Sequence, residues 1–429
     1  MTETNPKSEF VWGGLHPTGL DRHKEKRDSD RRAAKSFLSV LARADALYLR
    51  GDADGVRESL ALFDREAGNV GHWQAWVGRA FEATLGDLAL AELCRGYALT
   101  GSYPADIRLH PRVRVVWQEQ AVAASRRLAD RRGEGRALSN LGLARFELGN
   151  GREAIAFHEQ ALAAARETGD HEGEGHALGN LGNAWFARGE VRKAIDFYEQ
   201  RLAVARRTGD WRSEANALGS LGNGLFGLGE FRAAVDLYEK ALATARTAGD
   251  RRGEGMTLGN LGNAWLSLGD VPRAIDFYER RLSVARETGD RRAEGGVLSN
   301  LGAAWKQAGD VRTAIAFYEE ALTSLRATGD LRGEATALDN LGLARFELGE
   351  HAPAAADFEQ ALGIVRPTGN PRGEGLITFH LAVVTHRTGR GTEAVALALS
   401  ALELLCPVDP AAAADVGRAL AAWRATSCV

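Results

Sequence analysis

The chain has 429 residues, of which 45% are apolar and 26% are charged, as in a folded rather than a disordered protein. This length exceeds what one ordinary globular core accommodates. The formal net charge of -3 provides no general attraction to nucleic acid or to an anionic membrane, so neither is expected as a partner. No run of 18 apolar residues is present, and a membrane-spanning helix is therefore not expected.

Residues 1–29 are polar and contain Pro6 and Pro17, which predicts a disordered N-terminal segment. The apolar triplet Phe10-Val11-Trp12 is an exception that could dock on the fold or on a neighbouring molecule. No apolar core of a signal peptide is present, and three scattered cysteines suit neither a disulfide scaffold nor a four-ligand zinc site. Reduced cysteines in a cytoplasmic protein are expected, and the excess of arginine over lysine indicates a GC-rich bacterial gene.

Residues 30–130 show helical patterns without a strict period, which predicts a helical N-terminal cap containing a degenerate repeat. The cap is expected to have helices at 33–50, 56–66 and 73–85. A degenerate helix pair should follow at 88–100 and 111–129. Terminal units of a repeat array are usually atypical, because one of their faces meets water.

A strict 40-residue period then begins. Asn-Leu-Gly recurs from Asn140, Asn180, Asn260, Asn300 and Asn340, with Ser220-Leu221-Gly222 in the third unit. Gly-Asp closes the first five units, and Gly369-Asn370 closes the sixth. The period predicts seven units over 131–410, followed by a C-terminal capping helix over 411–429.

Each unit is predicted to contain two helices. In the second unit, Leu178, Leu181 and Trp185 have helical spacing, and Gly189 ends that helix. The second helix should span about 191–208, with Gly209 ending it and Asp210 capping the next. One such pair cannot bury its apolar face alone, so neighbouring pairs must stack into an all-α solenoid of antiparallel helix pairs with helical caps.

The pattern of Leu181-Gly182, Trp185, Ala194, Tyr198 and Leu202 resembles the tetratricopeptide repeat family, which implies a right-handed superhelical solenoid. The 40-residue length and the stretch LGNLGNAWFARGEVRKAIDFYEQRLAVARRTGD resemble Pins/LGN-type polarity adaptors. Residues 62–66 and 73–76 are similar to the linker ahead of the repeats in bacterial STAND-type signalling ATPases. The tetratricopeptide and Pins/LGN resemblances imply protein–protein interaction. The STAND resemblance implies a sensor arm that acts with a separately encoded enzyme.

The sequence contains no recognisable catalytic, cofactor or metal site. His171 and His176 are five residues apart, whereas a helical zinc-protease motif needs a spacing of four. The glycines around Gly175 recur 80 residues later, which marks them as part of the repeat rather than as a dinucleotide loop. There is no Gly-Lys pair and hence no P-loop. We therefore expect a non-catalytic protein without cofactors.

One face of each first helix, opposite the core positions, carries few charges: six charged residues in 42 positions, and none in units two to four. The resemblance places this face in a concave groove. Asparagine can pair with a peptide backbone, and phenylalanine beside glycine can form an apolar pocket. The candidate peptide-binding residues are Asn140, Asn180, Asn183, Phe186, Asn216, Asn223, Phe226, Asn260, Asn263, Asn300, Asn340 and Phe346.

The competing interpretation is that these asparagines bond only to neighbouring helices. The asparagine series is also interrupted at Ser220 and His380. The expected partner is a protein or peptide, while its identity and the oligomeric state are not indicated by the sequence. The alternative function is the sensor arm of a STAND-like signalling or defence system.

Two further patterns give structural expectations. Arginines from Arg126 to Arg366 close the second helices, and glutamates from Glu134 to Glu374 open the following helices, each at a spacing of 40. Salt bridges between successive units are the expected use of these charges, with ligand contacts by the arginines as the alternative. Four glycines between Gly219 and Gly227 suggest a hinge in the third unit.

Overall fold

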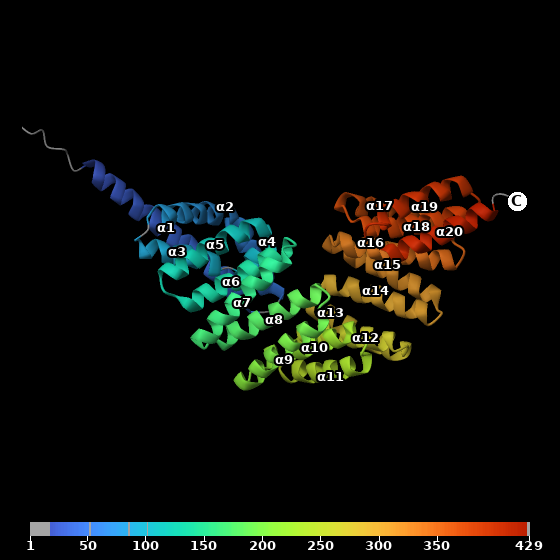
Figure 1. Ribbon diagram of the computed structural model, residues 1–429, viewed down its shortest axis with the longest axis horizontal. Coiled ribbons are helices and arrows are strands. Elements are labelled where there is room, and N and C mark those ends of the chain that lie inside the picture. The colour runs from blue at the N-terminus through green and yellow to red at the C-terminus, as the bar shows by residue number, and fades with distance from the viewer. Residues whose placement is uncertain (1–17, 51–52, 85, 101, 427–429) are drawn as a thin grey trace, which may run out of the picture. The chain divides into compact units, whose positions relative to one another are not determined.

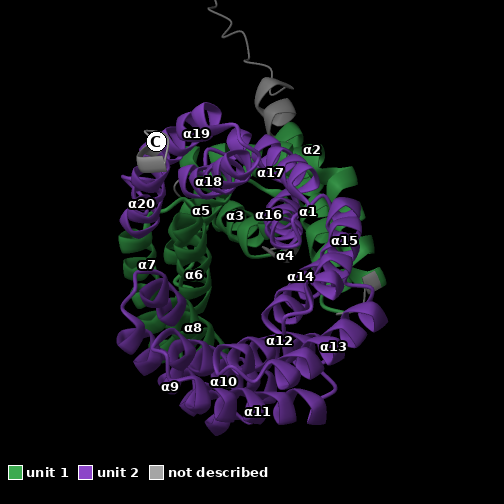
Figure 2. Ribbon diagram, turned by 90° about the vertical axis from the view of Figure 1, so that its right-hand side faces the viewer, with its two compact units in different colours: residues 1–180 green, residues 181–429 purple. Residues whose placement is uncertain are grey.

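The computed structural model describes residues 18–50, 53–84, 86–100 and 102–426, and all of its regular elements are helical (Figure 1). The all-α prediction is confirmed. The chain divides into two compact units, residues 1–180 and 181–429 (Figure 2). No helix in these described ranges has both the length and the apolar character needed to cross a membrane.

The N-terminal region contains α1 (Thr18–Tyr48), α2 (Ala53–Ala83), α3 (Leu88–Leu99), α4 (Ser102–Arg108) and α5 (Pro111–Arg127). The start of α1 corrects the prediction of disorder over 18–29. This stretch is rich in Arg, Lys and Glu, which favour helices even without an apolar face. Residues 1–17, including Phe10-Val11-Trp12, lie outside the described part of the chain.

Helix α2 also corrects the sequence analysis, because it joins two helices that were predicted separately. Gly68 and Gly71 lie between the two predicted helices, and a Cβ at either position would meet nothing within 4 Å. Phe63, Val70 and Val77, each seven residues apart, are buried along one stripe of the helix. This continuous apolar stripe offsets the roughly 1 kcal/mol that each interior glycine costs.

Seven helix pairs follow at the predicted period. The first helices are α6 (Arg131–Glu147), α8 (His171–Ala187), α10 (Trp211–Gly227), α12 (Arg251–Ser267), α14 (Arg291–Gln307), α16 (Leu331–Glu347) and α18 (Pro371–Arg387). The second helices are α7 (Gly151–Thr168), α9 (Val191–Thr208), α11 (Phe231–Thr247), α13 (Val271–Thr288), α15 (Val311–Thr328), α17 (His351–Val365, extended by the 3₁₀ turn Arg366–Thr368) and α19 (Gly391–Leu405). Helix α20 (Pro410–Thr426) packs on α19 and buries Val416 and Leu420.

The predicted helix boundaries have the expected chemistry. Asp210 caps α10 by accepting hydrogen bonds from the backbone N–H groups of Arg212 and Ser213, at 3.1 and 3.0 Å. Gly209 ends α9 with φ of 69°, a left-handed conformation that glycine adopts without a Cβ penalty. These two residues explain why the Gly-Asp pair recurs between successive repeats.

In six of the seven pairs, the core contains a close contact between a glycine and an aromatic ring, whereas the seventh pair has Ala382 and Ala398 at these positions. In α12, a Cβ on Gly262 would lie 2.6 Å from Cδ1 of the buried Tyr278. Gly182, Gly222 and Gly302 meet Tyr198, Tyr238 and Tyr318 in the same way, while Gly142 meets His158 and Gly342 meets Phe358. The missing side chain lets the two helices of a pair approach closely over the ring.

Trp185, Trp265 and Trp305 are half-buried and pack against the apolar clusters of unit 2. These three tryptophans therefore contribute to the core of the repeats.

Candidate functional site

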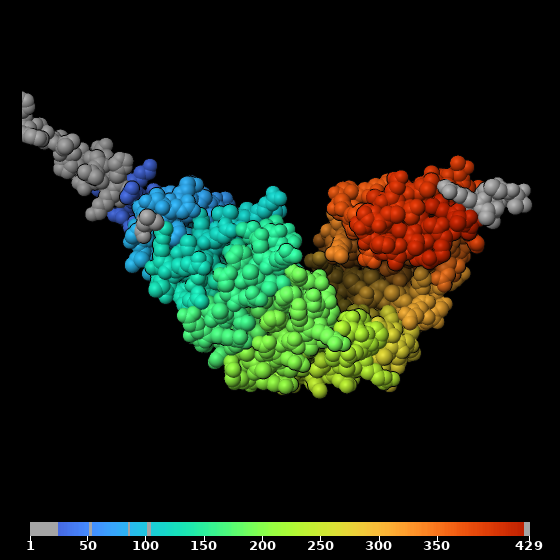
Figure 3. All heavy atoms as spheres, viewed as in Figure 1, coloured from blue at the N-terminus to red at the C-terminus, as the bar shows by residue number. Residues whose placement is uncertain are grey.

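The first helices of unit 2 lie on the inner side of a curved row, and the second helices lie on its outer side (Figure 2). Figure 3 shows the surface of unit 2 hollowed between its yellow part and its orange-to-red part. Solvent-exposed residues on the first helices of this unit include Met256, which is 59% exposed, and Phe186, which is 37% exposed. Exposed apolar side chains on an inner face suit contact with a partner.

Three of the predicted asparagines have a common and specific partner. Oδ1 of Asn183, Asn223 and Asn263 accepts a hydrogen bond from the hydroxyl of Tyr198, Tyr238 and Tyr278, at 2.8, 2.7 and 2.7 Å. The three asparagine side chains are exposed, whereas the tyrosines are buried. Because the carbonyl oxygen is occupied by the phenol, the amide orientation is fixed and its N–H₂ donor group faces away from the core.

The asparagines of the Asn-Leu-Gly tripeptide behave differently. In unit 1, Asn180 donates to Oγ of Ser139 at 3.2 Å. In unit 2, Asn260 donates to Oδ1 of Asn223 at 3.3 Å, and His380 contacts Asp339 at 2.7 Å from the same repeat position. Bonding to neighbouring helices, the competing interpretation, therefore occurs at these three positions.

The other candidates lie on the same first helices. Asn140, Asn300 and Asn340 are half-buried, and Asn216 is exposed. Phe226 and Phe346 are half-buried against the apolar clusters of unit 2, and Phe226 packs edge-on to Phe231, with ring centroids 5.1 Å apart. Phe226 and Phe346 thus contribute to the core as well as to the surface, and their part in ligand binding stays a prediction.

The hydrogen bonds from tyrosine change one expectation about stability. The sequence alone suggests that replacing Asn183 and Asn223 by alanine would leave the melting temperature nearly unchanged. The structure instead predicts a loss of about 1 kcal/mol or more per site, because each replacement leaves a buried phenol hydroxyl without its acceptor. Thermal unfolding of the double variant checks this, with Asn216→Ala as the control on an exposed asparagine. Equal melting temperatures for both variants would contradict the role of the tyrosines.

The predicted arginine–glutamate ladder is present along all seven repeats. Nε of the arginine and Oε1 of the glutamate are 2.6–3.2 Å apart in the pairs Arg126–Glu134, Arg166–Glu174, Arg206–Glu214, Arg246–Glu254, Arg286–Glu294, Arg326–Glu334 and Arg366–Glu374. The structural interpretation of these charges is confirmed. The ladder joins the end of each second helix to the start of the next first helix.

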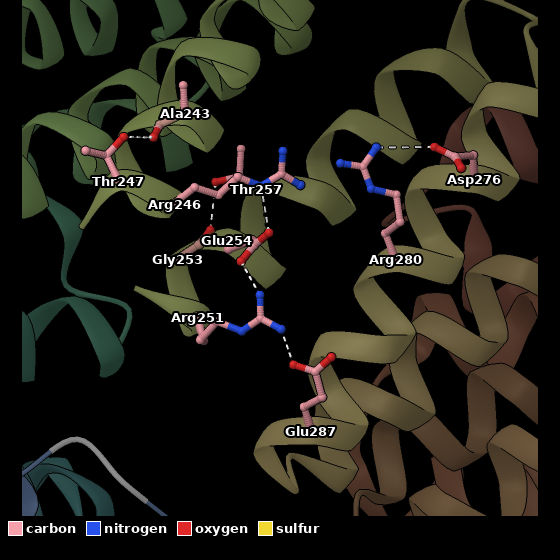
Figure 4. Close-up of polar contacts among 10 residues, drawn as sticks. All are labelled: Ala243, Arg246, Thr247, Arg251, Gly253, Glu254, Thr257, Asp276, Arg280 and Glu287. Atoms are coloured by element: carbon pink, nitrogen blue, oxygen red, sulfur yellow. Dashed lines mark hydrogen bonds and ion pairs between the residues drawn. The ribbon is translucent and has the colours of Figure 1, made fainter. Parts of the chain in front are cut away.

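Glu254 of this ladder has two arginine partners, which the close-up shows (Figure 4). It accepts from Arg246 at 2.8 Å and from Arg251 at 2.6 Å, and Arg251 also pairs with Glu287. Burial raises the pKa of the Glu254 carboxyl, but the hydrogen bonds from both arginines outweigh burial and hold the pKa below its ordinary value. The carboxylate is therefore ionised at neutral pH.

We expect Glu254→Gln to lower the free energy of unfolding by about 1–2 kcal/mol, since a nearly buried, charge-assisted pair is lost. Glu374→Gln is the matched control, because its carboxylate is more exposed and its arginine lies at 3.2 Å. That variant should cost less than about 1 kcal/mol. Urea unfolding of both variants makes the comparison, and equal losses would contradict it.

The glycines that suggest a hinge in the third repeat lie within an unbroken helix. Helix α10 is continuous from Trp211 to Gly227, and a Cβ on Gly224 would lie 2.7 Å from Cγ1 of Ile195. Gly222 is needed by Tyr238, as described above, and only Gly219 faces open space. A Cβ on Gly227 would lie 3.3 Å from Cε2 of Phe186. Close packing thus accounts for three of the four glycines, and the hinge remains a prediction.

Among the described residues, no group of three His, Cys, Asp or Glu side chains is placed to hold a metal ion. The side chains described above offer hydrogen bonding by amides, apolar contact and charge pairing on the inner face. These functions suit binding of another molecule.

The stacked helix pairs define a helical repeat protein. The tetratricopeptide repeat model matches residues 133–207, 213–287 and 294–366, which is more than half of the chain, so the chain belongs to the tetratricopeptide repeat family. No curated protein shows significant sequence similarity to it.

Solved structures share the fold at low identity. The apo form of the quorum sensor NprR from B. thuringiensis is 14% identical, with a TM-score of 0.59 over 88% of this chain and 99% of that one. A STAND protein with a tetratricopeptide repeat sensor from Pyrococcus horikoshii is 16% identical, with a TM-score of 0.57. That match covers 84% of this chain and 55% of the STAND protein. A Rap protein complexed with Competence and Sporulation Factor is 14% identical, with a TM-score of 0.50 over 90% and 98%.

Proposed function

We propose that the chain is a non-catalytic scaffold whose first helices bind an extended segment or a helix of a partner protein. The observation that carries this proposal is the series of exposed asparagines whose amides are oriented by buried tyrosines. Each of the three presents an outward amide donor at the same repeat position. A regular series of donors suits a ligand with regularly spaced acceptors, as a peptide backbone has.

The surroundings of these asparagines support the same function. The first helices of repeats two to four carry no charge on this face, and Met256 offers exposed apolar surface beside the amides. The NprR and Rap structures are those of a quorum sensor and of a protein complexed with Competence and Sporulation Factor, so this fold is compatible with ligand recognition. The resemblance of the 40-residue unit to Pins/LGN-type adaptors also favours a protein partner.

A second candidate function is the sensor arm of a STAND-like signalling system. The structural likeness to the Pyrococcus protein favours it, because that likeness extends over 84% of this chain and the Pyrococcus protein has a tetratricopeptide repeat sensor. Under this proposal, the same face would bind a signal protein and a separately encoded enzyme would respond.

The test begins with partners isolated by affinity capture and identified by mass spectrometry. Binding of the recombinant partner is then measured by calorimetry for Met256→Glu, which places a charge on exposed surface of the inner face. Ala243→Glu is the matched control, because Ala243 is exposed on the second helix α11. We expect Met256→Glu to weaken binding at least tenfold and Ala243→Glu to leave it unchanged. Equal affinity for both variants would overturn the proposal.

A further inference from the structure

Two arginines of unit 2 interrupt a pattern of small residues. The second helices have alanine at Ala161, Ala241, Ala321, Ala361 and Ala401, but arginine at the matching positions Arg201 and Arg281. The first helices of these same two repeats carry glycine at Gly179 and Gly259. The two arginines are 80 residues apart, so they lie at the same position in two repeats that are separated by one repeat.

The structure explains the glycine on α12. A Cβ on Gly259 would lie 2.9 Å from Cδ of Arg281, so the arginine side chain of α13 occupies the space that a larger residue would fill. In the repeat with Ala241, a Cβ on the corresponding Gly219 would meet nothing within 4 Å. Arg281 thus passes over the first helix of its own repeat through a gap that glycine provides.

Beyond this gap, Arg281 lines a cavity of about 540 Å³ in unit 2. Polar groups of α14 and α16 line the same cavity, including Asn300, Ser299 and Thr336. Arg292 and Arg332 are also at its wall, together with Asp290 and Asp330. Asn300 is one of the predicted peptide-binding residues, so the cavity lining includes a residue of the candidate binding face.

The acidic residues of the cavity are already engaged. Asp330 pairs with Arg292 at 3.0 Å and caps α16 by accepting from the N–H of Gly333 at 3.0 Å. Asp290 caps α14 by accepting from the N–H of Ala293 at 2.9 Å. Neither carboxylate forms an ion pair with Arg281, and the cavity lining keeps a net positive charge.

Within the described ranges, Arg281 and Arg201 have no ion-pair or hydrogen-bond partner, although both are half-buried. Nε of Arg201 is shielded from solvent and makes no hydrogen bond to any described residue. Burial lowers the pKa of both guanidinium groups, with Asp290 and Asp210 acting in the opposite direction at longer range. Arg280, the direct neighbour of Arg281, instead pairs with Asp276 at 3.3 Å on the surface (Figure 4).

An unpaired, partly desolvated guanidinium destabilises a fold, and a planar carboxylate is its best-matched partner. We propose that Arg281, and Arg201 two repeats before it, each bind a carboxylate of the ligand, so that the chain recognises a segment with two separated acidic groups. This inference rests on the proposed function and specifies its ligand class. The carboxylate comes either from an Asp or Glu side chain or from the end of the partner chain.

The test uses the full chain and three matched random-peptide libraries. One library has free C-termini, one has amidated C-termini, and one lacks Asp and Glu. We expect fewer binders from the library without acidic residues if side chains supply the carboxylates, and fewer from the amidated library if a chain end supplies one. Complete absence of binders would count against the proposed function itself, whereas equal recovery from all three libraries would overturn only this inference.

The selected acidic peptides are then measured with Arg281→Gln and Arg201→Gln. Each variant should bind about tenfold or more weakly, because a charge-assisted hydrogen bond is lost. Arg280→Gln, which removes the adjacent surface charge, should bind as the unmodified chain does. Unchanged affinity with Arg281→Gln would overturn the inference.

Thermal unfolding separates binding from a structural role. Without peptide, Arg281→Gln should melt at the same temperature as the unmodified chain or higher, since an unpaired half-buried charge is removed. A lower melting temperature would show that the guanidinium supports the fold, and would also overturn the inference.

Discussion

Replacing Gly222 by alanine is expected to lower the free energy of unfolding of unit 2 by about 1–3 kcal/mol. A Cβ at this position would lie 2.7 Å from Cδ1 of Tyr238, which is 2% exposed. The phenol of Tyr238 is also held by Asn223 at 2.7 Å, so a displaced ring would lose this hydrogen bond as well. Chemical unfolding monitored by circular dichroism measures the loss.

Gly219→Ala is the control within the same helix. Nothing lies within 4 Å of a Cβ at Gly219, so the substitution adds helix propensity without a clash. It should raise the free energy of unfolding by up to about 1 kcal/mol. If both substitutions changed stability by the same amount and in the same direction, the assignment of Gly222 to ring packing would be wrong.

The second large effect concerns acid stability of unit 1. His158 takes the place of the core tyrosine over Gly142, is 1% exposed, and has a buried Nδ1 without a hydrogen-bond partner among the residues that the structure describes. Burial lowers the pKa of His158 from 6.5 to about 4. The fold therefore retains the neutral imidazole, and the unfolded chain takes up a proton first as the pH falls.

The direction of the pH dependence follows from the lower pKa of His158 in the folded chain than in the unfolded chain. The contribution of His158 to stability is fully present above pH 6.5 and decreases as the pH falls toward 4, by about 3 kcal/mol at most. His158→Phe should abolish this part of the pH dependence, because phenylalanine cannot titrate. Repeat six offers a precedent, since Phe358 packs over Gly342 in the same way.

Urea unfolding of both proteins between pH 7 and pH 4 provides the measurement. The two stabilities should diverge progressively below pH 6.5, with the phenylalanine variant losing less. Parallel curves over this range would mean that His158 does not titrate with unfolding.

Much of the fold follows from the 40-residue period, because helix pairs, caps and glycine ends are local features that the sequence states directly. The arginine–glutamate ladder was equally predictable, since its partners are eight residues apart across one helix boundary. The continuous helix α2 was missed because Gly68 and Gly71 suggest a break. Only the packing of Phe63, Val70 and Val77 shows that the helix continues.

The site was less predictable. Positions along the first helix identified the exposed asparagines, but the bonds from tyrosine join residues 15 apart across a turn and change the expected effect of substitution. Arg281 was missed because its burial depends on Gly259 of another helix. The joint occurrence of arginine and glycine in two repeats, against alanine elsewhere, was the available signal.

Site-specific photo-cross-linking of the bound partner tests the inner face most directly. A benzoylphenylalanine at Met256 should cross-link to one short segment of the partner, and an excess of a peptide with that sequence should suppress the product. The same group at Ala243, on the second helix α11, should give no such product. Cross-links from Ala243 that the peptide suppresses, with none from Met256, would contradict binding on the first helices.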